Sequence, residues 1–253
     1  MKILVLGDIH GRPVWKNIIE KENPDKVIFL GDFVATHERN TPEQQIEQLE
    51  AILDYKDEHP NTVILRGNHD LDGLGYYWAS CWPRPDAYVC ERMNRNAPLG
   101  QRFLKASQWF KRELIGDKKV IFSHAGITRE WLTDVHKLKI GTKKQLEAAL
   151  NKIALMEPSE SFGFTGGRWD SGGTDPCQSC TWVRPYTLRE HAIPGYTQVV
   201  GHTPTHHKCQ SMSILVQKGE IWEESEDLIW RCDELGTKSY LVIEDNNFIP
   251  KSL

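Results

Sequence analysis

Five short apolar segments, each followed directly by a polar cluster that contains glycine, constrain this chain more than any other feature of its sequence. They occupy residues 3–6, 27–30, 63–65, 120–122 and 198–200. Continuous apolar runs of this length, bounded by turn residues, are typical of strands that are buried on both faces. The sequence therefore predicts buried strands whose carboxyl ends all carry polar side chains.

Helical patterns fill the gaps between the first three predicted strands. Residues 14–22 cover the first gap, and residues 42–56 cover the second with their apolar side chains on one face. Thr41 is the expected amino-terminal cap of the second helix, and Pro42 suits its first turn. An order of strand, helix, strand, helix, strand predicts a parallel sheet with crossover helices.

The C-terminal part of the chain has a different pattern. Apolar runs at residues 213–217, 227–231 and 239–244 follow one another with little room for helices. They predict an antiparallel block that closes the domain. The expected fold class is therefore α/β, with two packed mixed β-sheets flanked by helices.

Two stretches do not fit the repeated strand and helix unit. Residues 71–112 are rich in aromatic side chains, and residues 128–190 contain a helix near 142–155 followed by a glycine-rich loop. Loops at strand ends build the sites of open α/β sheets, so both stretches are expected to be insertions that form a cap beside the site. At 253 residues the chain is expected to be a single domain over residues 1–253.

Composition and charge argue against several other classes of protein. The apolar fraction of 39% and the charged fraction of 26% are those of an ordinary globular protein. No apolar segment approaches the roughly 18 residues of a membrane helix. The net charge is −4 without a long run of one sign, so no dedicated nucleic-acid surface is evident. Six cysteines in a chain of this length do not indicate a disulfide framework, so we expect a soluble, cytoplasmic protein.

The polar clusters after the strands contain side chains that bind metal ions. The candidate ligands are Asp8, His10, Asp32, Asn68, His124 and His202. Hard oxygen donors mixed with imidazole suit manganese, iron, zinc or magnesium better than a soft metal. Two ions about 3.5–4 Å apart need a bridging ligand, and a carboxylate suits this role because it offers two oxygens. The pattern therefore predicts a metal site where the strands end.

Taken in order, the five clusters resemble those of the calcineurin-like metallophosphoesterase superfamily. They read Gly-Asp-Ile-His-Gly, Gly-Asp, Gly-Asn-His-Asp, Ser-His-Ala-Gly and Gly-His-Thr-Pro. The resemblance runs from Gly7 to Pro204 and extends weakly into the strands that follow. It implies a metal-dependent phosphoesterase with two divalent ions, manganese first, with iron, zinc, nickel or magnesium as alternatives.

The resemblance also implies a role for each matching residue. Asp8 and His10 would bind the first ion, and Asp32 would bridge the two ions. The ligands of the second ion would be completed by Asn68, His124 and His202. His69 would face the substrate and protonate the leaving oxygen, a role that suits an imidazole with a pKa of about 6.5. Glycines 7, 31, 67 and 201 are expected to let each strand turn sharply without a Cβ.

A further fragment indicates a branch of this superfamily. Trp182-Val183-Arg184-Pro185 resembles an element of bacterial phosphoprotein-phosphatase-like enzymes and dinucleoside-polyphosphate hydrolases. By this resemblance Arg184 is a phosphate ligand, since a guanidinium group binds phosphate in a bidentate manner.

One segment departs from the phosphoprotein phosphatases. Those enzymes continue after the second aspartate as Val-Asp-Arg-Gly, where this chain has Val34-Ala35-Thr36-His37. It therefore lacks there the aspartate that orients the catalytic histidine and a phosphate-binding arginine. The third cluster also ends in Asp70, where those phosphatases have glutamate. The missing positive charge is expected to come from Arg12, His37 or Arg39.

Three functions follow from these features. The leading hypothesis is a hydrolase of phosphate esters that is similar to serine/threonine protein phosphatases. The first alternative is a hydrolase of dinucleoside polyphosphates, cyclic nucleotides or other phosphodiesters, because aromatic side chains near residues 76–82 could stack on a nucleobase. The second alternative is a catalytically silent scaffold with the same fold. The expected partner is a phosphorylated small molecule, a nucleotide or a phosphopeptide.

Several other candidates have plainer interpretations. Cys177 and Cys180, with Cys209 and Cys232 as partners, could hold a structural zinc ion, but a single Cys-x-x-Cys is weak evidence and packed thiols are simpler. The neighbouring histidines at positions 206 and 207 are interpreted as surface residues.

Overall fold

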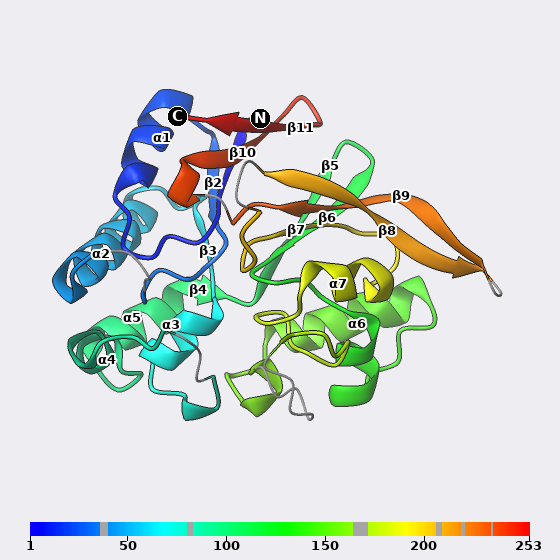
Figure 1. The fold of residues 1–253 in the computed structure, drawn as a ribbon, viewed down its shortest axis with the longest axis horizontal. Helices are drawn as coiled ribbons and strands as arrows, with labels where there is room; N and C mark the ends of the chain where they lie inside the picture. Colours follow the sequence, from blue (N-terminus) through cyan, green and yellow to red (C-terminus); the bar gives the residue numbers. More distant parts are fainter. Residues whose placement is uncertain (36–39, 80–82, 164–171, 206–208, 219–220, 234) are drawn as a thin grey trace.

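The computed structural model describes residues 1–35, 40–79, 83–163, 172–205, 209–218, 221–233 and 235–253 (Figure 1). Within these residues the strands form two sheets, one of six strands and one of five. None of the described helices combines the length and the apolar composition of a membrane-spanning segment.

The six-stranded sheet contains the N-terminal parallel strands. From edge to edge it consists of β11 (Asn247–Ser252), β10 (Ser239–Glu244), β1 (Ile3–Leu6), β2 (Lys26–Phe29), β3 (Val63–Leu65) and β4 (Ser107–Gln108). The strands from β1 to β4 run parallel, whereas β10 is antiparallel to β1 and β11 is antiparallel to β10. The carboxyl ends of β1, β2 and β3 therefore lie at one edge of the sheet.

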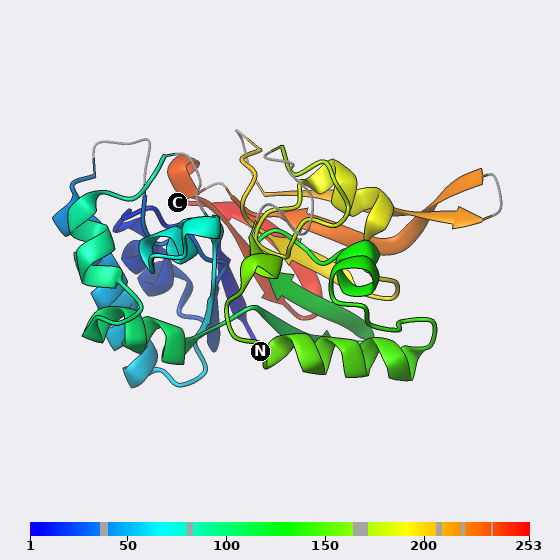
Figure 2. The same ribbon diagram turned by 90° about the horizontal axis from the view of Figure 1, so that it is seen from below.

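The five-stranded sheet mixes both orientations. Its order is β5 (Phe110–Ile115), β6 (Lys118–Ser123), β7 (Thr197–Val200), β9 (Ile221–Arg231) and β8 (Gln210–Lys218). β6, β7 and β9 run parallel, so their carboxyl ends also share an edge. β5 and β8 are antiparallel to their neighbours, and the β8–β9 ribbon projects from the body of the protein (Figure 2).

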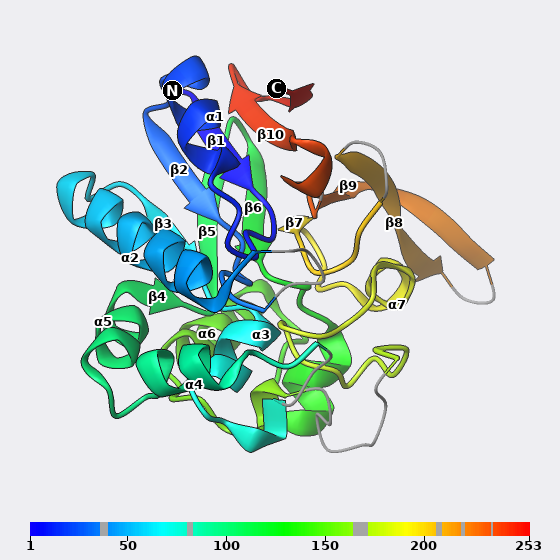
Figure 3. The same cartoon turned by 60° about the vertical axis from the view of Figure 1, so that its left-hand side comes forward.

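The helices lie on the outer sides of the two sheets (Figures 1 and 3). The α-helices are α1 (Val14–Glu22), α2 (Pro42–Glu58), α3 (Asn68–Gly73), α4 (Ala87–Met93), α5 (Pro98–Ala106), α6 (Lys143–Ala154) and α7 (Pro185–His191). Shorter turns are η1 (Tyr77–Ala79), η2 (Trp131–Val135), η3 (Glu160–Phe162) and η4 (Leu235–Thr237). α4 and α5 pack against α2 and against each other.

The core has two layers because each buried strand contributes both of its faces. Along β1, Ile3 and Val5 belong to a cluster between the two sheets that also contains Phe122. Leu4 and Leu6 belong to the larger cluster under the helices. Burial on both faces explains why the parallel strands read as continuous apolar runs and not as alternating patterns.

The predicted N-terminal elements are confirmed within narrow limits. β1, β3 and α1 have the expected bounds, and α2 continues two residues further, to Glu58. The side chain of Thr41 accepts a hydrogen bond from the backbone N–H of Gln44, whose own side chain accepts from the N–H of Thr41. This capping box fixes the start of α2 as the sequence predicted.

The predicted antiparallel C-terminal block is confirmed for the pair of β8 and β9 and wrong for β10. β9 is parallel to β7 and antiparallel only to β8, while β10 leaves this sheet and pairs with β1 in the other. The C-terminal strands are therefore divided between the two sheets, and β9 brings its carboxyl end to the edge where β7 ends.

The first stretch expected to be an insertion, residues 71–112, ends inside the core. It includes β4, which pairs with β3, and the first residues of β5. Trp109, between these strands, is buried, stacks on Phe162 with ring centroids 3.7 Å apart, and donates its indole N–H to the carbonyl oxygen of Met156 at 2.7 Å. This tryptophan therefore joins the two stretches that were expected to be insertions.

His136 is expected to make folding stability depend on pH. Burial lowers its pKa from 6.5 to about 4, with a further contribution from Lys152. As pH falls below 6.5, the unfolded chain takes up a proton that the folded chain does not, so stability is lost towards pH 4. We expect a loss of about 2 kcal/mol between about pH 7.5 and about pH 5.

Urea unfolding with a chelator present measures this loss. His136→Leu should remove about 2 kcal/mol of the pH dependence, and the difference between the two proteins cancels the other titrating groups. An unchanged pH dependence in the variant would contradict the assignment.

Candidate metal centre

Five polar clusters converge because parallel strands end at a common edge. Asp8 and His10 follow β1, Asp32 follows β2, and Asn68 follows β3. From the other sheet, His124 follows β6 and His202 follows β7. His10 is partly buried and the other five of these residues are buried.

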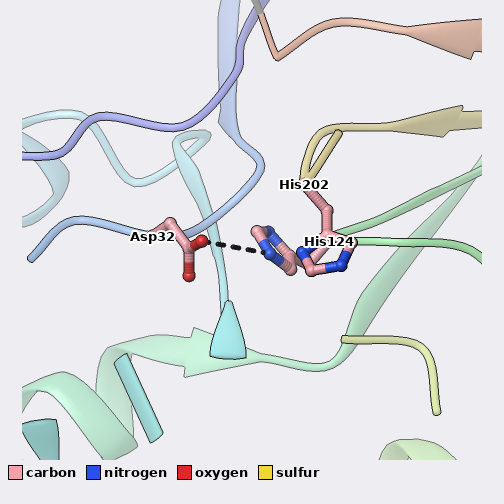
Figure 4. A group of neighbouring side chains, drawn as sticks. All are labelled: Asp32, His124 and His202. Carbon is pink, nitrogen blue, oxygen red and sulfur yellow. Dashed lines mark ion pairs between the residues drawn. The ribbon is translucent and has the colours of Figure 1, made fainter. Parts of the chain in front are cut away.

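Two groups of ligand atoms form within this cluster, and Asp32 belongs to both. Asp32, His124 and His202 offer atoms within 4.8 Å of one another, and so do Asp8, His10 and Asp32. Figure 4 shows the rings of His124 and His202 beside the carboxylate of Asp32. The distance from Nε2 of His124 to Oδ2 of Asp32 is 3.4 Å.

Asn68 joins the two histidines of the second sheet. Its Oδ1 atom lies 2.9 Å from Nε2 of His124 and 3.0 Å from Nδ1 of His202. Nδ1 of His124 lies 2.9 Å from the carbonyl oxygen of Leu30. A hydrogen bond from Nδ1–H to a carbonyl oxygen leaves the Nε2 lone pair of His124 facing the cluster, as a metal ligand requires.

Burial shifts the pKa values of these groups strongly. Burial and the nearby Asp233 raise the pKa of Asp8, and burial raises that of Asp32. Burial, with Arg12, lowers the pKa of His10 to about 4, and burial, with His124, lowers that of His202. Two ionised carboxylates that are buried beside neutral imidazoles repel each other, and cations bound between them offset this repulsion. The donor set therefore fits divalent metal ions.

Three of the candidate ligands have an unusual backbone conformation. The φ angle is +47° at His10, +50° at Asp32 and +64° at His202. Such left-handed conformations cost roughly 1–3 kcal/mol each for residues other than glycine. The surrounding hydrogen bonds oppose this cost, because the N–H of His10 donates to the carbonyl of Asp32 and that of His202 to Oδ1 of Asp8.

The glycines before the ligands act mainly by leaving space, which differs from the sharp turns that the sequence predicted. Gly31 is the one of the four with a positive φ, +110°. A Cβ on Gly67 would lie 2.1 Å from Oδ1 of Asp32, and one on Gly201 would lie 2.3 Å from Oδ1 of Asp8. The missing side chains therefore allow strand ends from different parts of the chain to touch.

Gly67→Ala is expected to damage the centre through this contact. The new Cβ would also lie 2.5 Å from the backbone nitrogen of Asp32, which cannot move freely. We expect a loss of about 2–3 kcal/mol in the free energy of unfolding and a lower content of bound divalent metal. Urea unfolding and metal analysis measure the two effects.

A matched control for this variant is Gly141→Ala. Its Cβ would contact Oε1 of Gln145 at an ordinary 3.5 Å. Similar results for the two variants would show that close packing at Gly67 does not matter.

Asp70 holds the second and third clusters together. Its carboxylate is buried and accepts backbone N–H groups from Asp32, Phe33 and Gly67 at 2.8–2.9 Å. Burial and the charge of Asp32 raise the pKa of Asp70 to about 7 despite these hydrogen bonds. The shorter acid in place of glutamate thus organises the loop that carries Asp32.

His69 lies at the rim of the cluster. Its backbone N–H donates to Oδ1 of Asp32 at 2.9 Å, and its Nε2 lies 4.0 Å from Oδ2 of that carboxylate. Its ring lies edge-on to the ring of His10, with centroids 5.4 Å apart. Asp32 and His10 therefore fix the place of His69, which the sequence left without an explanation.

The predicted phosphate-binding arginines differ in their surroundings. Arg184, at the start of α7, donates to Oγ1 of Thr203 at 3.1 Å, next to His202. Arg12 donates to the backbone carbonyl of Asp8 at 2.9 Å. Arg39 and His37 lie outside the described residues. Arg184 therefore lies next to His202, and Arg12 lies next to Asp8.

One acidic residue beside the cluster was not predicted from the sequence. Asp233 follows β9 and is a principal source of the charge felt by Asp8 and Arg184. The signal that could have found it is an aspartate two residues after an apolar run, but that run was interpreted as antiparallel.

One aromatic residue contacts the cluster, because the rings of Trp182 and His202 have centroids 5.3 Å apart, whereas the cysteines belong to neither group of potential ligands among the described residues. Cys177 and Cys180 are buried free thiols, and the groups of potential metal ligands among the described residues contain no cysteine. Tyr76 packs on Trp78 with ring centroids 5.1 Å apart, and Arg95 lies over its ring. Trp82 and the histidine pair at 206 and 207 lie outside the described residues.

Comparison with known sequences gives two matches. A profile of the family described as "Calcineurin-like phosphoesterase" matches residues 1–206 of this chain. A curated protein of Proteus mirabilis (strain HI4320), named "Bis(5'-nucleosyl)-tetraphosphatase, symmetrical", is 26% identical over 140 residues. The match covers 52% of this chain and 46% of that protein, so it spans less than half of the relative's length.

Comparison with solved structures gives similarity over almost the whole chain. A hypothetical protein of Pyrococcus horikoshii OT3 is 12% identical, with 99% of this chain and 86% of that chain covered and a TM-score of 0.49. A metallophosphoesterase from Sphaerobacter thermophilus is 16% identical, with 99% and 87% covered and a TM-score of 0.40. For Yfce, a phosphoesterase from E. coli, the identity is 14%, the coverage 100% and 99%, and the TM-score 0.37.

Proposed function

We propose a mechanism for this chain, which belongs to the calcineurin-like phosphoesterase family and hydrolyses phosphate esters with the help of metal ions. In this proposal two divalent ions are held by Asp8, His10, Asp32, Asn68, His124 and His202. The observation that supports it most is the shared position of Asp32 in both groups of ligand atoms. Asp32 would therefore be the carboxylate shared by the two closely spaced ions.

The residues around this bridge have separate tasks. When bound, the two ions would supply a water of lowered pKa for attack on phosphorus and would offset the charge of the phosphate. Arg184 and Arg12 would hold phosphate oxygens through their guanidinium groups. His69, placed by its hydrogen bond to Asp32, would donate a proton to the departing oxygen.

Manganese is the first choice for both ions. Carboxylate, amide and imidazole donors together suit manganese, iron, zinc, nickel or magnesium, and manganese accepts a mixed oxygen and nitrogen set readily. The test is to strip the protein with a chelator, add each metal in turn and measure turnover of p-nitrophenyl phosphate. Manganese should restore the highest rate, with two ions per chain at saturation. Turnover that persists in the stripped protein would overturn the proposal.

Dinucleoside polyphosphates are a second candidate substrate class. Two observations favour them: the name of the Proteus mirabilis relative and the absence of Val-Asp-Arg-Gly after Asp32, which separates the chain from protein phosphatases. Arg184 and the two ions could bind successive phosphates of such a chain.

A panel of four substrates separates the candidates. It contains p-nitrophenyl phosphate, its bis ester, a phosphopeptide and a dinucleoside tetraphosphate, with Asp32→Asn measured alongside to subtract any contaminating phosphatase. If dinucleoside polyphosphates are the substrate class, kcat/KM for the tetraphosphate should exceed kcat/KM for the phosphopeptide by at least about tenfold. Comparable values would remove the nucleotide candidate and favour a general or protein phosphatase.

A further inference from the structure

β9 is a sixth strand that ends at the metal centre. It runs parallel to β7, with Arg231 opposite Val200, and the N–H of Cys232 donates to the carbonyl of Val200 at 2.7 Å. Since parallel strands end at the same edge, the residue after Cys232 lies where His202 follows β7. That residue is Asp233. The geometry that gathers the other candidate ligands therefore also brings Asp233 to the site.

The backbone of Asp233 also lies against the loop that carries Asp8. A Cβ on Gly7 would lie 2.0 Å from the carbonyl oxygen of Cys232 and 3.0 Å from Cα of Asp233. The absence of a side chain at Gly7 therefore allows the end of β9 to approach the first metal-binding cluster. A carboxylate is brought next to Asp8 in this way.

The negative charge of Asp233 reaches this site. Asp233 belongs to neither group of potential metal ligands within the part of the chain that the structure describes. Burial raises the pKa of Asp8 most, and the charge of Asp233 raises it next. For Arg184, burial lowers the pKa and the charge of Asp233 raises it. The negative charge of Asp233 is thus felt both at the candidate ligands and at the candidate phosphate-binding arginine.

The charges of the loaded site show what this carboxylate does. Two divalent ions, Arg184 and Arg12 carry six positive charges, against two negative charges on Asp8 and Asp32. Another carboxylate nearby attracts the ions and repels a phosphate anion. Removal of this charge should therefore weaken metal binding and strengthen phosphate binding, whereas a loss of structure would weaken both.

We propose that Asp233 is a positioning residue whose negative charge strengthens binding of the two metal ions and weakens retention of the phosphate product. This role rests on the proposed metal centre. By opposing the excess positive charge of the loaded site, Asp233 lets phosphate leave after hydrolysis while the metals remain bound.

The test measures two constants in the same protein. Mn²⁺ affinity is measured by calorimetry, and the inhibition constant of inorganic phosphate is measured at saturating Mn²⁺. Asp233→Asn should weaken Mn²⁺ binding by about tenfold and tighten phosphate inhibition by about threefold. Asp233→Glu should keep both constants close to those of the unchanged protein. Asp233→Ser, which removes the charge with a smaller side chain, should move both constants as Asp233→Asn does.

The control is Asp227→Asn, the same change on the same strand but away from its carboxyl end. It should leave both constants unchanged. If the variants without the charge bind Mn²⁺ and phosphate both more weakly, or match the unchanged protein in both, the role of Asp233 is wrong while the metal centre stands. If the unchanged protein binds no Mn²⁺, the proposed function fails and the role of Asp233 fails with it.

Discussion

Asp32→Asn is expected to reduce hydrolysis by at least about a thousandfold and to lower the metal content below two ions per chain. Asp32 is the residue shared by both groups of ligand atoms, so its charge opposes that of two cations at once. Asparagine offers one oxygen and no charge, and it therefore cannot bridge. Its amide oxygen can still accept the N–H of His69, as Oδ1 of Asp32 does at 2.9 Å, so the loop should keep its shape.

Metal analysis and steady-state kinetics with p-nitrophenyl phosphate measure this result. Asp25→Asn is a matched control, because Asp25 is exposed and precedes the amino end of β2, whereas Asp32 follows its carboxyl end. The control should retain full activity and two ions. Full turnover in Asp32→Asn with normal metal content would show that the bridge is not at this residue.

His69→Asn is expected to keep the metals and to lose rate by a factor that depends on the leaving group. A general acid contributes about 10²–10⁴-fold when the leaving oxygen is basic, as in an alkyl phosphate. p-Nitrophenolate needs little protonation, so its loss should be smaller by at least about tenfold. The ring of His69 lies at the rim of the cluster, beside His10, and is in neither group of ligand atoms within the described residues.

The measurement compares kcat for p-nitrophenyl phosphate and for an alkyl phosphate in both proteins, with metal content as the reference. His59→Asn is a control, since His59 is exposed at the end of α2 and packs on Tyr55. Equal losses for the two substrates in His69→Asn would remove His69 as the acid and leave it a role in binding. A loss of metal would make it a ligand.

Much of the N-terminal fold could be predicted because its signals are local. Apolar runs bounded by glycine gave β1 and β3, and Thr41 followed by Pro42 gave the start of α2. β4 was missed because it has only two residues, Ser107 and Gln108, neither of which is apolar. α7 was missed because it lies at the end of the stretch 128–190, which was interpreted as an insertion with a single helix near 142–155.

The pairing of the C-terminal strands could not be read from the sequence. An apolar run identifies a strand but not its neighbour, and β10 finds its partner in β1, more than two hundred residues earlier. The same difficulty hid Asp233, since its place at the site depends on β9 being parallel to β7. Long-range pairing is decided by packing of the whole sheet and not by local preference.

The convergence of the candidate site could be predicted from the sequence, whereas the roles of its residues stay a prediction. The six expected ligand residues lie together, because each follows a parallel strand and such strands end at one edge. What the sequence did not give is how closely the loops touch. The contacts of Gly67 with Asp32, and of Asp70 with three backbone N–H groups, depend on distances between strands far apart in the chain.

The most direct test of the central claim is anomalous diffraction from crystals of the protein grown with Mn²⁺. Two peaks are predicted, about 3.5–4 Å apart, with the carboxylate of Asp32 between them. One should lie against Asp8 and His10, and the other against Asn68, His124 and His202. A single peak, or peaks away from Asp32, would contradict the account.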